Sequence, residues 1–100
     1  MTPTETITVT ARFKIKPGLE GMLRRELDTV MALTRNETGC ISYNLHQSDS
    51  DPLQFLMLEQ WVSQEALDEH LQMPYIKSLF VKAAMLLAEP VELDFWKSLI

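Results

Sequence analysis

The sequence predicts an α+β domain in which helices cover one face of a four-stranded antiparallel sheet. Four segments carry the pattern of β-strands, and two regions carry the three- and four-residue spacing of amphipathic helices. These segments follow one another in the order β-α-β-β-α-β. The chain has 100 residues, of which 46% are hydrophobic and 23% charged, as is typical of a small globular protein. We therefore expect one domain over residues 1–100, with its core over about 6–97.

The first strand is predicted over Ile7–Lys16, where apolar odd-numbered residues alternate with polar even-numbered ones. Pro17-Gly18 ends this strand, because both residues favour turns. A helix is expected from Leu19 to about Asn36, since apolar residues recur there at steps of three and four. We expect Gly39 to take the left-handed conformation that often ends a helix.

Two further strands are predicted over Cys40–Gln47 and Leu53–Trp61, joined by the turn-forming stretch SDSDP. Strand periodicity places Ile41, Tyr43 and Leu45 on one face of the first of them. The second is apolar on both faces in its middle, which is typical of a covered strand. We expect the two strands to form an antiparallel hairpin.

A second helical region begins after Ser63, which is a good N-cap residue. Its apolar face includes His70. Met73-Pro74 interrupts the region, and proline at a first helical position then starts a new segment. The new segment has a buried stripe of apolar residues, and a last strand is predicted over Val91–Trp96.

This order of elements is the ferredoxin-like split βαβ pattern. Because the helices of such a fold cover one sheet face, the other face meets water or a partner. The outward residues include Leu56, Leu58 and Trp96 beside polar ones. Scattered surface hydrophobes are one explanation. We favour a homodimer that stacks sheet on sheet, because a wide exposed apolar patch is unfavourable on a monomer.

Charge and cysteine content exclude several classes of partner and site. The net charge is −5, and the nine basic residues form no cluster, so nucleic acid and anionic membranes are poor partners. The single cysteine, Cys40, excludes an internal disulfide and a cysteine-built zinc site. It is compatible with a reducing compartment, so we expect a cytoplasmic protein. The chain carries no signal-peptide pattern and no run of 18 apolar residues, so we expect no membrane insertion.

A candidate site is predicted where the third strand meets the second helical region. Strand parity puts Glu59 and Trp61 on one face, together with Phe55 and Met57. His70 lies on the apolar side of the helix that follows. If both sides face one interior, they form with Tyr43 a polar end of an apolar pocket, which suits a small aromatic ligand. His70 would be able to remove a phenolic proton near neutral pH, and Trp61 to stack on a ring.

Each of these residues also has a structural interpretation. His70 would bond a backbone carbonyl or Glu59, and Glu59 would pair with Arg12 or Lys14 on a neighbouring strand. Trp61 would be a core residue, and Tyr43 would pack with its hydroxyl at the rim. We expect the second histidine, His46, on the surface or at a dimer contact.

Sequence motifs for nucleotide binding and for serine hydrolases are missing from the chain. Its two histidines lie far apart in the sequence and do not have the spacing of a metal site. We therefore expect no metal site.

Several short motifs follow one another along the chain in an order that is typical of one protein family. They are the sequences KPG, ETGC with a tyrosine three residues on, DP, EQWVSQEAL and HLQMP. In this order and spacing the chain resembles the antibiotic biosynthesis monooxygenase (ABM) family over about residues 6–97.

The resemblance implies a dimeric α+β barrel and oxygenases that act on quinols, anthrones or related polyphenols, without metal or flavin cofactor. It further implies the roles of individual residues. We expect His70 and Tyr43 to be catalytic. The substrate-binding residues are then expected to be Trp61, Glu59, Tyr75, Phe55 and Met57.

The family also contains members that resemble haem-degrading oxygenases, which place a histidine on the last helix. Here that helix reads KSLFV, which counts against haem. Many quinol-type members read H-x-x-x-P-H, whereas here the last position is Tyr75, which leaves His70 as the base for neutral pH.

Two alternative functions are also compatible with this fold. One is a non-catalytic ligand-binding or stress-response module. The other is an isomerase of a small phosphorylated metabolite, which would need a cationic pocket. The cations available to build one are Arg12, Arg35 and Lys77.

Overall fold

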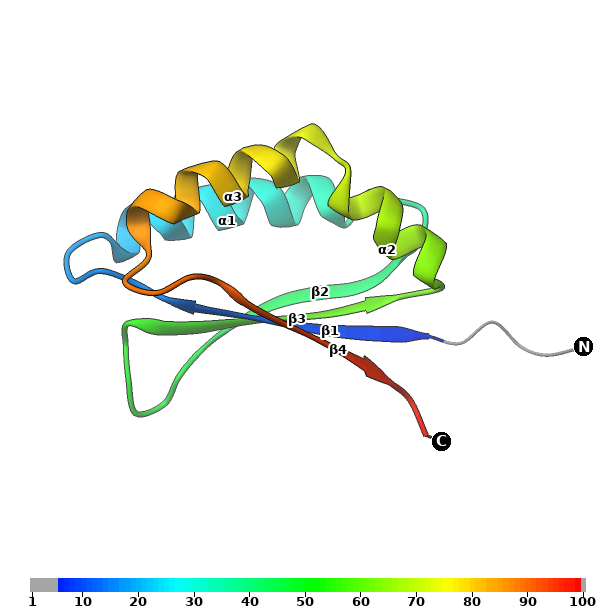
Figure 1. Ribbon diagram of the computed structural model, residues 1–100, viewed down its shortest axis with the longest axis horizontal. Coiled ribbons are helices and arrows are strands. Elements are labelled where there is room, and N and C mark those ends of the chain that lie inside the picture. Colours follow the sequence, from blue (N-terminus) through cyan, green and yellow to red (C-terminus); the bar gives the residue numbers. More distant parts are fainter. Residues whose placement is uncertain (1–5, 100) are drawn as a thin grey trace, which may run out of the picture.

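The computed structural model describes residues 6–99 and has the predicted order of elements (Figure 1). The elements are β1 (Ile7–Lys14), α1 (Glu20–Thr34), β2 (Cys40–Gln47), β3 (Gln54–Trp61), α2 (Gln64–Leu71), α3 (Pro74–Leu86) and β4 (Glu92–Lys97). The strands form one sheet in the order β2-β3-β1-β4, and all neighbours are antiparallel. All three helices lie on the same face of this sheet (Figure 1). The predicted ferredoxin-like fold is therefore confirmed.

The core lies between the helices and the inner face of the sheet. The alternation of β1 predicts this directly: Val9, Ala11 and Phe13 are buried, and the residues between them face outward. On β3 the inward set is Phe55, Met57, Glu59 and Trp61, and all four are buried. Apart from Glu59, the alternating residues of these two paired strands thus form one apolar surface, which helices α1 and α3 cover.

Two local signals position helix α2 and hence His70. Ser63 is extended, and its side chain accepts a hydrogen bond from the Ala66 amide at 3.1 Å, as predicted for an N-cap. At the other end Met73 is extended and Pro74 is the first residue of α3. The chain therefore bends between α2 and α3, which directs the buried face of each short helix toward the sheet.

The structure corrects the prediction for Ile41. This side chain is 51% exposed, although Tyr43 is buried as expected. The pairing register between β2 and β3 shifts between Cys40 and Ser42, so β2 has a bulge there. A bulge adds one residue to a strand and reverses the direction of the side chains before it. Cys40, which is half-buried, therefore takes the place beside Tyr43 on the inner face that was predicted for Ile41.

The structure also corrects the prediction for Gly39. Among the described residues only Gly18 has a positive φ, of 89°. Helix α1 already ends at Thr34, and Arg35, which caps it, keeps helical angles. A Cβ atom at Gly39 would overlap the Cβ of Ala66 on α2. Gly39 therefore lets α2 approach the start of β2, rather than supplying a left-handed turn.

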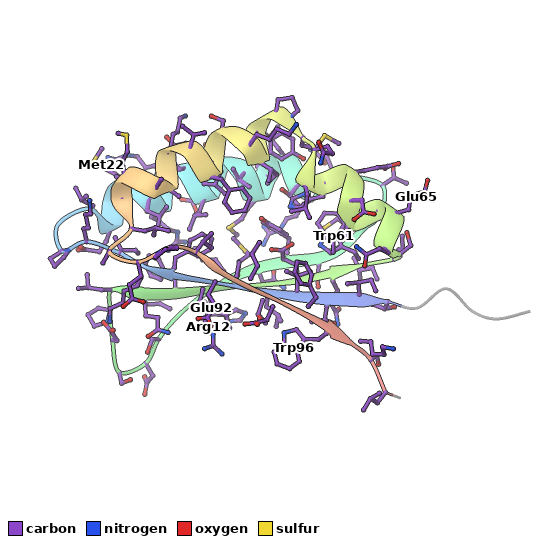
Figure 2. All side chains as sticks on the ribbon, viewed as in Figure 1. Arg12, Met22, Trp61, Glu65, Glu92 and Trp96 are labelled. Carbon is purple, nitrogen blue, oxygen red and sulfur yellow. The ribbon has the colours of Figure 1, made fainter. Side chains whose placement is uncertain are left out.

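The outer face of the sheet has no covering element within residues 6–99. Leu58 is 37% and Trp96 53% exposed on this face. Figure 2 shows Arg12 and Trp96 projecting from the sheet on the side away from the helices. The Trp96 indole donates a hydrogen bond to Thr10 Oγ1 at 3.0 Å. The apolar residues predicted to face outward therefore do so.

Candidate active site

The candidate site lies on the inner face of the sheet, where β3 ends beneath α2. Glu59 and Trp61 project from β3, and Tyr43 stands opposite Glu59 on β2. His70 descends from α2 toward them. All four residues are at most 5% exposed. The structure thus brings together four of the predicted site residues, and Figure 2 shows Trp61 between the sheet and the helices.

Three of these residues form an aromatic cluster. The ring centroids of Trp61 and His70 are 4.4 Å apart, and the ring planes are tilted by 37°. Tyr43 meets the His70 ring edge-on at 5.5 Å. These contacts fix the plane of the imidazole, so its two nitrogens point in set directions.

The Nδ1 atom of His70 lies 2.8 Å from Oε2 of Glu37. The Tyr75 hydroxyl donates a hydrogen bond to the same carboxylate oxygen. Glu37 follows α1 in a turn, in which its amide bonds the Thr34 carbonyl and its carbonyl accepts from the Cys40 amide. Its side chain is 10% exposed. A largely buried carboxylate therefore holds His70 and Tyr75 together.

Glu37 is the residue that sequence reasoning missed. It stands in the quoted ETGC motif, but 33 positions separate it from His70. The available signal was its neighbour Gly39, whose missing side chain lets α2 approach. Arg35 adds a second constraint, because its guanidinium donates to the Tyr43 carbonyl at 2.8 Å and so ties the end of α1 to β2.

The contact with Glu37 sets the tautomer of His70. Because a carboxylate only accepts hydrogen bonds, Nδ1 carries the proton and donates it. In the neutral ring Nε2 then holds a free lone pair. This atom lies 4.0 Å from Oε1 of Glu59, which is too far for a direct hydrogen bond. The same Glu59 oxygen accepts a bond of 3.1 Å from the Trp61 indole, so Glu59 pairs with Trp61 and not with Arg12 or Lys14. Lys14 pairs with Asp51 instead.

Burial shifts the pKa values of both Glu59 and His70, the two titrating groups that face each other here. It raises the pKa of Glu59 to about 7, and the hydrogen bond from Trp61 only partly opposes this. Burial also lowers the pKa of His70 below its usual value, against the opposing influence of Glu37. Near neutral pH the site therefore presents an uncharged imidazole base facing a carboxyl group that exchanges its proton in the same pH range.

Tyr43 supplies a hydroxyl that stays protonated, because burial raises its pKa well above the usual value. The nearby Thr34 hydroxyl acts in the opposite direction on this pKa. Thr34 Oγ1 itself is buried and, among residues 6–99, has no partner in hydrogen-bonding geometry. Such an atom is a place for a water molecule or a ligand oxygen. Tyr75 also stays protonated, since burial and Glu37 raise its pKa to about 12.

A small cavity of about 20 Å³ adjoins these groups. Tyr43, Glu59 and His70 line its polar end, and apolar residues of β1, β4, α2 and α3 line the rest. This volume holds about one water molecule. An aromatic substrate therefore requires side chains at the cavity wall to move.

The remaining predicted residues take other places. Phe55 and Met57 are buried in the core and do not line the cavity. Tyr75 contacts Glu37 on the far side of His70. His46 is exposed on β2, opposite Leu56, on the outer face of the sheet.

Within the described part of the chain, no group of three or more His, Cys, Asp or Glu side chains is placed to hold a metal ion. The helices found there are all too short or too polar to cross a membrane.

Comparison with known proteins finds relatives along almost the whole chain. The protein "Putative monooxygenase Rv0793" of Mycobacterium tuberculosis is 36% identical over 88 residues, which are 88% of this chain and 86% of that protein. An uncharacterized protein of Synechocystis, sll1783, is 34% identical over 91% of this chain. The aligned part is 62% of the length of that cyanobacterial protein.

Solved structures agree with the fold. The structure of Rv0793 is 33% identical, with a TM-score of 0.90 over 95% of this chain and 96% of that one. PA3566 of Pseudomonas aeruginosa is 31% identical, with a TM-score of 0.90 over the full length of both chains. The family model described as antibiotic biosynthesis monooxygenase matches residues 6–81. The chain therefore belongs to the antibiotic biosynthesis monooxygenase family.

Proposed function

We propose that the protein is a monooxygenase that oxidises a small quinol or polyphenol with O₂ and uses no metal or flavin. The observation that carries this proposal is the arrangement of His70. Its Nδ1 atom is held by Glu37, and its free Nε2 atom faces Glu59 at the polar end of a small cavity whose other walls are apolar. A base that is uncharged at neutral pH and shielded from water suits removal of a phenolic proton.

The chemistry follows from a deprotonated, electron-rich ring. His70 Nε2 takes the phenolic proton, and the phenolate transfers electrons to O₂. One oxygen atom bonds to a ring carbon, and the other leaves as water with two hydrogens of the substrate. A hydroquinone would thus become a hydroxyquinone, and the substrate itself supplies all four electrons that O₂ accepts.

Glu59 and Tyr43 have supporting roles in this proposal. Glu59 lies 4.0 Å from Nε2 and has a pKa of about 7, so it is able to return a proton to the departing oxygen. The protonated Tyr43 hydroxyl is a donor for a substrate oxygen. Trp61 holds Glu59 through its indole and packs against His70.

The charges of the chain favour this function over an isomerase of a phosphorylated metabolite. Arg35 is engaged with β2, Arg12 lies on the outer face of the sheet and Lys77 is exposed on α3. These cations come from three different places, whereas phosphate binding needs converging donors.

We also propose a homodimer that joins the outer faces of two sheets. The exposed Leu58 and Trp96 on the face that the helices leave uncovered support this assembly.

Oxygen uptake tests the proposed activity. The protein, treated with chelator, is mixed with hydroquinones and an anthrone, and uptake is compared with autoxidation in buffer. We expect saturable uptake, which His70→Ala lowers by about 10²- to 10⁴-fold through loss of the base. Glu65→Gln, on the exposed face of α2, is the control and should retain full uptake. Binding of these compounds without uptake above the buffer rate would instead favour a ligand-binding module.

A further inference from the structure

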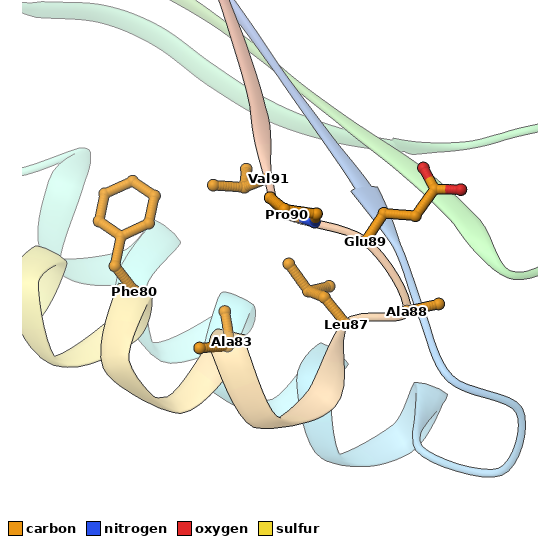
Figure 3. A pocket seen from close by; sticks show the side chains of 8 residues that line it. Phe80, Ala83, Leu87, Ala88, Glu89, Pro90 and Val91 are labelled. Carbon is orange, nitrogen blue, oxygen red and sulfur yellow. The ribbon is translucent and has the colours of Figure 1, made fainter.

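A groove larger than the cavity beside His70 lies next to it, on the other side of the Phe80 ring. The groove, of about 440 Å³, lies between α3 and the segment that leads from it into β4. Figure 3 shows this groove, with the Phe80 ring at one end and Val91 facing it. Phe80 lines both the groove and the His70 cavity. Its side chain is half-buried, so it separates the two spaces without being locked in the core.

Helix and strand spacing show that the two spaces lie end to end. On α3, Ile76, Phe80 and Ala83 follow one another on one face at steps of four and three. Ile76 lines the cavity, Ala83 the groove, and Phe80 both. The opposite wall repeats this order.

That wall is formed by β4 and the residue before it. Val91 lines the groove, whereas Leu93 and Phe95 line the cavity. These three alternate residues share one face of the strand, and Leu93 and Phe95 stand opposite the inward-facing Ala11 and Val9. One trough therefore runs between α3 and β4, and the Phe80 ring divides it.

We propose that the groove is a subsite for an apolar substituent of the aromatic substrate, whose phenolic ring reaches His70 when Phe80 turns aside. This inference rests on the proposed function for the identity of the ring at His70. It defines the substrate further, as a phenol that carries an alkyl chain.

Size and lining support this occupant. The His70 cavity alone holds about one water molecule, whereas the groove lies in the range of roughly 300–1,000 Å³ that is usual for small-molecule sites. Apart from Glu89, the groove is lined by apolar residues of α3 and the segment that follows it. The carboxylate of Glu89 points away from Phe80 in Figure 3. A neutral apolar substituent therefore fits, and an anionic one is disfavoured by the single charge at the rim.

Affinities of phenol and 4-hexylphenol test the subsite without turnover. We expect 4-hexylphenol to bind the wild-type protein at least tenfold more tightly than phenol, because its chain enters the groove. Ala84 lines the groove and is exposed, so Ala84→Phe partly fills it without disturbing the core. This variant should lose at least tenfold in affinity for 4-hexylphenol and keep its affinity for phenol within twofold.

Val81→Phe is the matched control. Val81 lies on the same helix, is 72% exposed and does not line the groove. This variant should bind both compounds like the wild type. Equal affinities of Ala84→Phe and the wild type for 4-hexylphenol would overturn the subsite. Sedimentation of Ala84→Phe adds a second check, because a change in oligomeric state would mean that the groove is covered by another copy of the chain, which also overturns it.

NMR of the same titration tests whether the two spaces act as one. We expect 4-hexylphenol to shift the His70 imidazole signals and the Ala83 and Val91 methyl signals with one dissociation constant. If the methyl signals shift while the His70 imidazole signals do not, the groove and the cavity are separate spaces, and the proposal is overturned. Oxygen uptake with unsubstituted hydroquinone tests the proposed monooxygenase activity separately. The activity and the subsite are therefore able to fail independently of each other.

Discussion

His70 lies between two carboxylates whose environments differ. Glu37 makes a direct hydrogen bond to Nδ1, whereas Glu59 stands 4.0 Å from Nε2 and is held by Trp61. The first contact orients the ring and raises its pKa, against the effect of burial. The second leaves a gap in which a substrate hydroxyl is able to sit. Glu37 is therefore a positioning residue and Glu59 a partner in proton transfer.

Replacing Glu37 by Gln should change both the rate and its pH dependence. The carboxylate favours the protonated imidazole, so its loss lowers the pKa of His70. We expect the acid limb of the oxygen-uptake profile to move to lower pH. The maximal rate should fall roughly tenfold, because an amide also permits the other tautomer. Glu65→Gln should leave the profile unchanged. A uniform loss of rate with an unmoved acid limb would contradict the positioning role.

Replacing Glu59 by Gln should stabilise the protein at alkaline pH. The folded state binds the proton of Glu59 with a pKa of about 7, above the ordinary value of 4.5. Its contribution to stability is therefore present below pH 4.5 and is lost as pH rises through 7. The difference in unfolding free energy between Glu59→Gln and the wild type should grow from pH 5 to pH 8 by on the order of 3 kcal/mol.

Urea unfolding of both proteins at several pH values measures this difference. His70 is present in both, so its own titration largely cancels. Glutamine still accepts the bond from Trp61. Parallel pH dependences of the two proteins would show that the Glu59 carboxyl group is not desolvated.

At the scale of elements, the contact between α2 and the start of β2 determines the site. Gly39 brings α2 close, and Ser63 and Pro74 define where α2 begins and where α3 takes over. This approach places His70 beside Glu37, which follows the neighbouring helix. The small residue Gly39 at this contact thus makes possible the hydrogen bond between His70 and Glu37.

Gly39→Ala should therefore destabilise the protein, because its new methyl group would overlap Ala66. We expect a loss of about 1–3 kcal/mol in unfolding free energy, as is usual for overpacking. Adding Ala66→Gly removes the overlap and should recover part of this loss, although glycine in a helix costs about 1 kcal/mol. The measurement is thermal and urea unfolding of the three variants. If the double variant is no more stable than Gly39→Ala, the close approach is not the cause.

At the scale of the whole molecule, the two faces of the sheet have different surroundings. The inner face carries the core and the site, whereas the outer face exposes apolar side chains next to Arg12. The trough between α3 and β4 opens along the edge of the sheet. Dimerisation through the outer face would leave this opening accessible, since the groove lies on the helical side.

Leu58→Asp should weaken the proposed dimer. Leu58 lies on the outer face opposite Thr10 and Asn44, near the middle of the sheet. A carboxylate buried in an apolar interface is costly, so we expect dissociation constants at least roughly a hundredfold higher. Sedimentation equilibrium measures them, with Val81→Asp on the exposed side of α3 as the control. A wild-type protein that sediments as a monomer would contradict the dimer itself.

Much of the fold was predictable because its signals are local. Alternation in β1 and the break at Met73-Pro74 depend on neighbouring residues, and the structure confirms both. Strand parity also predicted that Glu59 and Trp61 share a buried face. The direction of Ile41 was not predictable, because a bulge depends on how two strands pair and leaves no period in the sequence.

The sequence by itself determined the order of elements, the face that each presents and the group of residue types at the end of β3. Only the tertiary structure decided that Glu37, rather than Glu59 or a backbone carbonyl, holds His70. It also decided that the cavity is small and that Phe80 separates it from a larger groove. The physical reason is the distance along the chain over which each kind of signal acts. Periodicity reports the surroundings of a residue within a few positions, whereas a hydrogen bond across 33 positions or the volume of a cavity depends on how distant elements pack.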